Sequence, residues 1–169
     1  MAQYELTLIF GESSTDDART ALRKKLDAMI KKGGGTAEIE EWGKRQLAHS
    51  MNDNRYGYYL HYVLECPEAL PNELTAQLRL EETVVRFMLV AKLPALMVKL
   101  PKSRDGTEGG ETIEVSYKKI DSLMRYVTER GKIVPGRVSR LDAKQQRALA
   151  REIKRSRMIG LMPFTTMGQ

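Results

Sequence analysis

Two spacings of apolar residues alternate along the first half of the chain. Over residues 3–10 apolar side chains occupy every second position, which is typical of a β-strand. From Thr15 to Lys32 apolar residues recur instead on one helical face, and Gly33–Gly35 provides a stop. The chain is therefore predicted to begin with a strand and a helix.

The same spacings predict the rest of an N-terminal domain. The remaining elements are expected to be strands over 36–49 (bent or bulged at Gly43), 56–65 and 82–92, and a helix over 67–80. The resulting order βαββαβ predicts an α+β fold, a ferredoxin-like split sandwich with two helices on one face of a four-stranded antiparallel sheet. Because the last strand is apolar on both sides, cover is expected on the second face as well, from the rest of the chain or from a partner.

A change of composition predicts a linker after this domain. Residues 103–110 are polar and rich in glycine, whereas residues 95–100 are apolar enough to dock on a folded surface. The predicted organisation is a ferredoxin-like domain over 1–93, a flexible linker over 94–111 and a second unit over 112–169.

The second unit is expected to be small, helical and basic. A helix that begins at Ile120 is expected to end at Gly131, where a loop follows. Asp142 and Gln145 fit a capping box that starts a helix over 143–157. One stripe of that helix is expected to face a core: Leu149, Ile153 and Ser156.

Charge is divided unevenly along the chain. Residues 1–100 hold 13 Lys/Arg and 14 Asp/Glu, whereas residues 101–169 hold 15 and 8. Across residues 118–157 the basic residues outnumber the acidic ones 13 to 4, too few acids to pair them all. This asymmetry indicates that the C-terminal part meets a polyanion. The residues expected to contact it are Lys132, Arg137, Arg140, Lys144, Arg147, Arg151, Lys154, Arg155 and Arg157.

Residues suited to catalysis or metal binding are scarce. The chain has two histidines, His49 and His61, and one cysteine, Cys66. No glycine-rich phosphate loop precedes a helix, and a single thiol cannot form an internal disulfide or an all-cysteine zinc site. We therefore expect no enzyme activity, no cofactor, no metal and no small-molecule substrate. No apolar run is long enough to span a membrane, and the N-terminus lacks the features of a signal peptide, so no membrane partner is expected.

The C-terminal sequence carries a set of short motifs in a fixed order. Residues 120–164 contain ERGKI at a helix end, a proline-arginine loop, a QR-containing helix, IKR-x-R and a final LMPF, and they closely resemble bacterial small-subunit ribosomal protein eighteen. Residues 3–92 contain YELTLIF, EWGKRQLAH, HYVLE and RLEETVVRFMLV in order, and they resemble small-subunit ribosomal protein six. Arg140 is a departure, since it stands where the first of these families commonly has glycine.

The resemblance implies a fusion of two families that bind the small-subunit RNA platform side by side. It implies a structural component of the small ribosomal subunit, with small-subunit rRNA of the central domain and neighbouring small-subunit ribosomal proteins as partners. The second unit is expected to dock on the first, and the tether to keep the two at high effective concentration. In the near-neutral N-terminal domain the expected RNA contacts are Lys44, Arg45 and Arg86. The implied location is the cytoplasmic ribosome, with an organellar ribosome left open.

Two other interpretations compete with this one. The first is an RNA-recognition-motif-like protein that reads single-stranded RNA by aromatic stacking. Residues 55–62 loosely echo the third-strand octamer of such proteins, but a glycine and an aromatic residue are transposed at Tyr56-Gly57, and the first strand lacks the partner hexamer. The second is a ferredoxin-like enzyme or sensor, for which the sequence offers no group of polar residues to line a pocket. The ribosomal interpretation is favoured over both.

Overall fold

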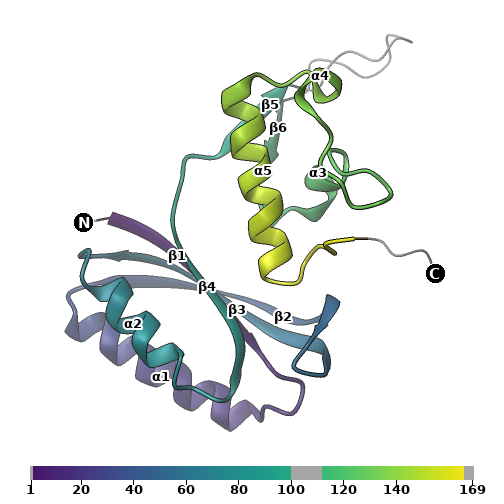
Figure 1. The fold of residues 1–169 in the computed structure, drawn as a ribbon. Coiled ribbons are helices and arrows are strands. Elements are labelled where there is room, and N and C mark those ends of the chain that lie inside the picture. The colour runs from purple at the N-terminus through teal and green to yellow at the C-terminus, as the bar shows by residue number, and fades with distance from the viewer. Residues whose placement is uncertain (1, 100–111, 166–169) are drawn as a thin grey trace. The chain divides into compact units, whose positions relative to one another are not determined.

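The computed structural model describes residues 2–99 and 112–165 of the chain (Figure 1). The chain divides into two compact units, Met1–Leu93 and Pro94–Gln169. The first is built on a four-stranded sheet, and the second contains a two-stranded sheet together with short and long helices.

The first unit has the predicted order of elements, βαββαβ. Its strands and helices are β1 (Ala2–Phe10), α1 (Asp16–Lys32), β2 (Thr36–Met51), β3 (Asn54–Cys66), α2 (Leu70–Leu78) and β4 (Val84–Ala91). The strands pair in the order β2-β3-β1-β4, with every neighbouring pair antiparallel. Both helices lie on one face of this sheet (Figure 1). The prediction of a ferredoxin-like sandwich is therefore confirmed.

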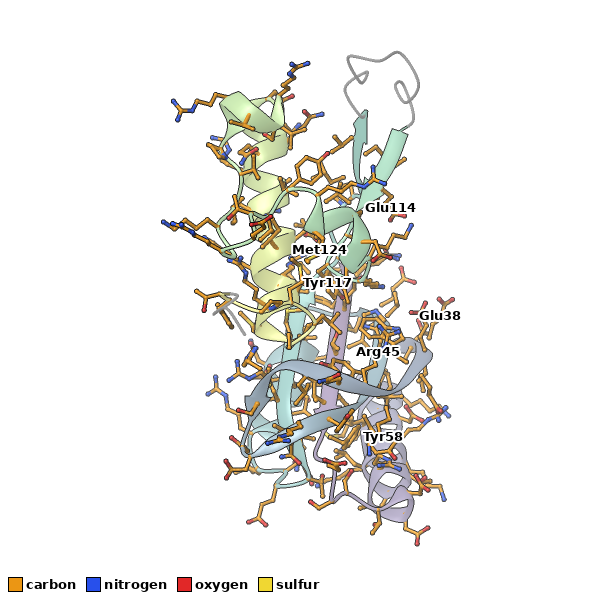
Figure 2. All side chains as sticks on the ribbon, turned by 90° about the vertical axis from the view of Figure 1, so that its right-hand side faces the viewer. Glu38, Arg45, Tyr58, Glu114, Tyr117 and Met124 are labelled. Atoms are coloured by element: carbon orange, nitrogen blue, oxygen red, sulfur yellow. The ribbon has the colours of Figure 1, made fainter. Side chains whose placement is uncertain are left out.

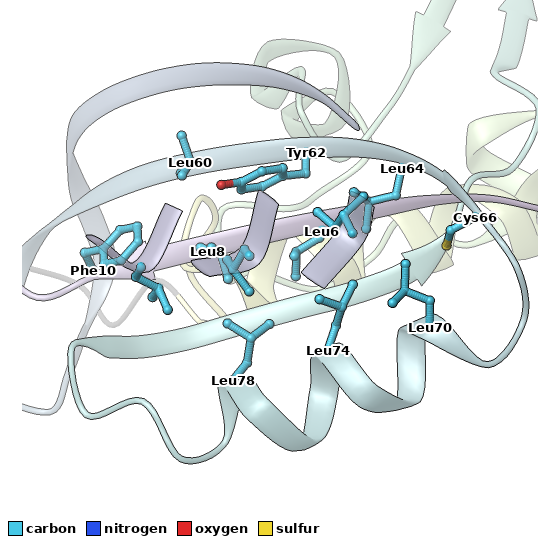
Figure 3. Close-up of a cluster of buried hydrophobic side chains, with 13 residues drawn as sticks. Leu6, Leu8, Phe10, Leu60, Tyr62, Leu64, Cys66, Leu70, Leu74 and Leu78 are labelled. Atoms are coloured by element: carbon cyan, nitrogen blue, oxygen red, sulfur yellow. The ribbon is translucent and has the colours of Figure 1, made fainter. Parts of the chain in front are cut away.

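Alternation along the strands builds the core of this unit. Leu6, Leu8 and Phe10 of β1 are at most 1% exposed, and they lie in one cluster with leucines of both helices. Figure 3 shows Leu70, Leu74 and Leu78, one turn apart on α2, facing the leucines of the sheet. The spacing of four residues on α2 and of two residues on β1 turns both sets of side chains toward the same interior.

The pairing of the strands is irregular at several points, and one of these changes which residue faces the core. In β2 the register shifts between Glu41 and Gly43, where Gly43 has a φ of +73°, so of the bend or bulge predicted at Gly43 a bulge is found. A second shift, between Ile9 and Phe10 of β1, pairs Phe10 with Val84. Val84 consequently packs against the core together with Phe87 and Leu89, although simple alternation placed it on the opposite face.

The second unit begins earlier than the sequence predicted. Strand β5 (Leu96–Lys99) pairs antiparallel with β6 (Thr112–Val115), so part of the segment predicted as a flexible linker over 94–111 is a strand of this unit. Val98 and Val115 are each 1% exposed, and their burial explains why this short apolar segment becomes ordered. The polar stretch expected to be flexible, residues 103–110, lies outside the described residues.

Three helices complete the second unit: α3 (Ile120–Met124), α4 (Gly136–Ser139) and α5 (Ala143–Met158). The first of them ends before the predicted stop at Gly131, because the chain turns at Arg125 and then forms a bridge between Val127 and Ile133. Helix α4 lies within the region predicted to be a loop. The core of the unit joins the hairpin, α3 and α5 through Val98, Val115, Leu123, Tyr126, Leu149, Ile153 and Met162.

Candidate nucleic-acid interface

Helix α5 starts at the predicted capping box. The Asp142 carboxylate accepts the backbone N–H of Gln145 at 2.6 Å, and the Gln145 side chain accepts the backbone N–H of Asp142 at 3.2 Å. These bonds satisfy amide groups that no helical carbonyl can reach. They fix where the helix begins, and therefore which of its residues face outward.

Burial separates α5 into an inner and an outer side. The predicted inner stripe of Leu149, Ile153 and Ser156 is completely buried, as expected. Figure 2 shows nitrogen-tipped side chains that extend from α5 on the side away from the β5–β6 hairpin. Cations on the outer side can therefore reach a ligand without disturbing the core.

Seven of the predicted contacts are exposed, and their side chains form no hydrogen bond or ion pair with residues 2–99 or 112–165. They are Lys132, Arg137, Arg140, Lys144, Arg147, Arg151 and Lys154. Unpaired cations repel one another, and holding them on one small unit raises its free energy unless an anionic partner is present. This surface, called the basic surface below, therefore suits a polyanion.

Side-chain hydrogen bonds hold the loop that leads into α5. Gln146 donates to the Val134 carbonyl at 2.8 Å and accepts from the Ser139 hydroxyl at 2.8 Å. The backbone N–H of Arg140 donates to the Gly136 carbonyl at 2.9 Å and closes the turn of α4. The loop that carries Arg137 and Arg140 is thus fastened to the first turn of α5 through Gln146.

Arg155 and Arg157 differ from these seven cations because the side chains of both form hydrogen bonds within the second unit. Arg155 donates to Glu152 at 3.1 Å, and each of these two side chains is only 12% exposed. Arg157 donates to the carbonyls of Gly131 and Pro163, at 3.2 Å to the latter, and burial lowers the pKa of its guanidinium from the ordinary value. Arg157 therefore joins the 128–132 turn and the C-terminal residues to the end of α5, which is a role the sequence did not indicate.

Glu152 is a second residue whose role the sequence did not indicate. It is 9% exposed, and its second oxygen accepts the backbone N–H of Tyr117 at 3.0 Å. One carboxylate thus joins the end of the hairpin to α5 and orients Arg155. The sequence gives only a weak signal for this role. Glu152 is the only acid within a basic helix, and it stands next to the buried stripe of Leu149 and Ile153.

Replacing Glu152 by alanine is expected to destabilise the second unit by about 2–3 kcal/mol, because a buried N–H and a largely buried guanidinium each lose their hydrogen bond to this carboxylate. The glutamine variant keeps an acceptor for Tyr117, so its loss should be about half as large. Urea unfolding of the full chain and hydrogen exchange at the Tyr117 amide measure both effects. Glu129→Ala, which removes an exposed acid, is the control and should change stability by less than about 0.5 kcal/mol. Unchanged protection of the Tyr117 amide in the alanine variant would contradict the assigned role.

The three predicted contacts of the first unit do not lie in one environment. Lys44 pairs with Glu12 at 2.9 Å, and this hydrogen bond raises the pKa of the lysine. The guanidinium of Arg45 lies 5.4 Å from the centre of the Trp42 ring and donates to the Trp42 carbonyl at 3.3 Å. Arg86 is exposed and stands opposite Ile9 in the sheet. Lys44 and Arg45 lie on β2 and Arg86 on β4, at opposite edges of the sheet, and they do not form a cluster like the basic surface.

The aromatic residues do not form the open platform that base stacking requires. Tyr62 is 0% exposed and points into the core between sheet and helices (Figure 3). Tyr59 is 2% exposed and stacks on Trp42 with ring centres 6.2 Å apart. The positions of β1 that face away from the core hold Glu5, Thr7 and Ile9 rather than aromatic side chains. The fold of a recognition motif is present, but its stacking surface is not.

Metal binding and membrane crossing find no support among the described residues. Over residues 2–99 and 112–165, no group of three or more His, Cys, Asp or Glu side chains could hold a metal ion. In the same residues, no helix has the length and apolar character that crossing a membrane demands.

The fold and the charge distribution define a class of protein, a ferredoxin-like domain followed by a small basic helical unit. The family model for ribosomal protein S6 matches residues 3–91, which is more than half of the chain, and the model for ribosomal protein S18 matches residues 111–162. The chain therefore belongs to the ribosomal protein S6 family and continues into an S18 match, in the order of an S6–S18 fusion. Both matches support a small-subunit ribosomal protein.

A solved structure supports the fold of the first unit. The chain is similar to the crystal structure of 30S ribosomal protein S6 from Thermotoga maritima, determined at 1.70 Å, with 19% sequence identity and a TM-score of 0.51. The similarity covers 54% of this chain and 87% of that chain. At this identity the comparison establishes the shared fold and nothing further.

Proposed function

We propose that the chain is a non-catalytic, structural component of the small ribosomal subunit whose second unit binds rRNA of the central domain. The observation that supports this most is the basic surface, seven exposed cations without partners in the described part of the chain, carried by the S18-like unit. Phosphate contacts need cations that are exposed, prepositioned and not already paired. Arg155 and Arg157 then contribute chiefly by stabilising the structure that carries the basic surface, because their guanidinium groups already donate hydrogen bonds to protein groups.

The first unit acts in this proposal mainly as a docking partner. Its net charge is near zero, and its predicted contacts Lys44 and Arg45 already engage Glu12 and Trp42. We infer that it binds the S18-like unit and neighbouring small-subunit proteins, with Arg86 adding at most one phosphate contact. A tether between two units that bind the same RNA raises the affinity of the pair through effective concentration. The site of action would be the cytoplasmic ribosome.

Footprinting tests this proposal directly. The purified full chain is expected to protect a compact group of nucleotides in the central domain of small-subunit rRNA from hydroxyl radicals. It should also prefer this RNA to large-subunit rRNA by about 10³-fold or more, as specific nucleic-acid binding generally does. Equal affinity for both RNAs would show that the basic surface binds polyanions without specificity, and it would overturn the proposal.

A further inference from the structure

Arg140 has a backbone conformation that an arginine rarely adopts. Its φ of +57° and ψ of +21° lie in the left-handed region, at the C-cap of α4. Two other described non-glycine residues have positive φ, Asn52 and Asp53, and these belong to the residue types that tolerate this region. Asparagine and aspartate can offset the strain of this region by a local hydrogen bond from the short side chain to the backbone. Arginine gains no such bond, so the strain at Arg140 is uncompensated.

The surrounding hydrogen bonds impose this conformation. The backbone N–H of Arg140 is tied to the Gly136 carbonyl, and Ser139 just before it is tied to Gln146. Two residues later Asp142 must cap α5. Because both flanks are fixed, the chain has to reverse at residue 140 whichever side chain stands there. Strained backbone of this kind persists only where neighbouring contacts determine it fully, and it often marks a functional position.

The guanidinium itself does nothing for the fold. The side chain is exposed, and it forms no hydrogen bond or ion pair within the described residues. The nearest acid in sequence, Asp142, already accepts from Gln145. Glycine would satisfy this backbone without steric strain, and asparagine with little. Within the described residues, the fold therefore supplies no side-chain contact that favours arginine at this position.

We propose that Arg140 is a phosphate contact of the α4–α5 junction, held in a strained conformation that stabilises RNA binding at the expense of folding. The fixed backbone holds the Cβ of Arg140 in position before the RNA binds, so the side chain loses less conformational freedom on binding. Arg137 on α4 and Lys144 on α5 flank it in sequence and are equally exposed and unpaired within the described residues. Along the sequence, Arg140 therefore lies between the cation of α4 and those of α5. This inference rests on the proposed function, since the anion is taken to be rRNA.

The test uses two variants of the full chain, Arg140→Gly and Arg140→Asn, with a transcript of the small-subunit central domain as the probe. Both should unfold at the same temperature as the parent chain or slightly above it, because relief of strain offsets the added freedom of the unfolded state. Both should bind the RNA about 5- to 10-fold more weakly, and the slope of log K against log salt should fall by about 0.7–0.9. Weaker binding without any loss of thermal stability is a result that a merely structural arginine would not give.

The control is Arg125→Ala, which removes an exposed cation from the same unit outside the basic surface, and it should change affinity by less than about 2-fold. Affinity within about 2-fold of the parent for both Arg140 variants would overturn this inference, as would a lower unfolding temperature in both. If Arg147→Ala still weakens binding in that case, the proposed function stands and only Arg140 is misassigned. Absence of binding by the parent chain would overturn both.

Discussion

Replacing Arg147 and Arg151 together by alanine is expected to weaken binding to central-domain rRNA by about 10- to 100-fold at moderate salt, since each substitution removes one charge-assisted contact. Both side chains are exposed and unpaired in the described part of the chain, and neither lies on the buried stripe of α5. The fold should therefore survive, and the far-ultraviolet circular dichroism should be unchanged. Among substitutions that leave the fold intact, this one should have the largest effect on binding.

Salt dependence separates phosphate contacts from other losses of affinity. If the basic surface neutralises roughly 5–7 phosphates, the parent chain should show a slope of log K against log salt of about −4 to −6. The double variant should flatten that slope by about 2, because two fewer counterions are released. Filter binding at several salt concentrations gives both numbers.

A matched control removes the same charge from another surface. Lys24 and Lys31 are exposed residues of α1 in the first unit, and replacing both by alanine should leave affinity and slope nearly unchanged. A slope near zero for the parent chain would contradict binding through phosphates. Equal losses in the two double variants would show that net charge matters and the basic surface does not.

Gly131→Ala is expected to have the largest effect on stability, a loss of about 3 kcal/mol or more from the second unit. Gly131 has a φ of +75°, which alone costs an alanine about 1–2 kcal/mol. In addition, a Cβ at this position would lie 2.7 Å from the Phe164 carbonyl oxygen and 2.9 Å from the Thr165 Cα. Because these are backbone atoms, they cannot swing aside, and the contact with the C-terminal residues has to open.

The clash can be isolated by comparison with Gly34→Ala. Gly34 has nearly the same φ, +72°, but a Cβ added there would meet no atom within 4 Å, so only the backbone cost of about 1–2 kcal/mol should be measured. Hydrogen exchange at the amides of Gly131 and Lys132, which bond to Thr128, reports the opening of the turn. Equal destabilisation by the two substitutions would show that the C-terminal residues do not pack on this turn.

Features that depend on nearby residues were predictable from the sequence. The capping box of α5 joins Asp142 to Gln145 three positions away, and the leucine spacing of α2 places its side chains on one face without reference to the rest of the chain. The alternation in β1 predicted the inward-facing Leu6 and Leu8 for the same reason. These patterns follow from the 3.6-residue and two-residue periods of helix and strand, which are local properties of the backbone.

Local patterns were thus sufficient for the ferredoxin-like order, the start of the basic helix and the outward cations on it. Which cations are already engaged depends instead on contacts between distant segments. Arg157 reaches Gly131, 26 residues away, and Glu152 reaches Tyr117, 35 residues away. Residues 96–99 become a strand because their partner strand begins at Thr112, and residue 140 is left-handed because both of its flanks are held. These features required the folded structure, since no local period encodes which segments meet.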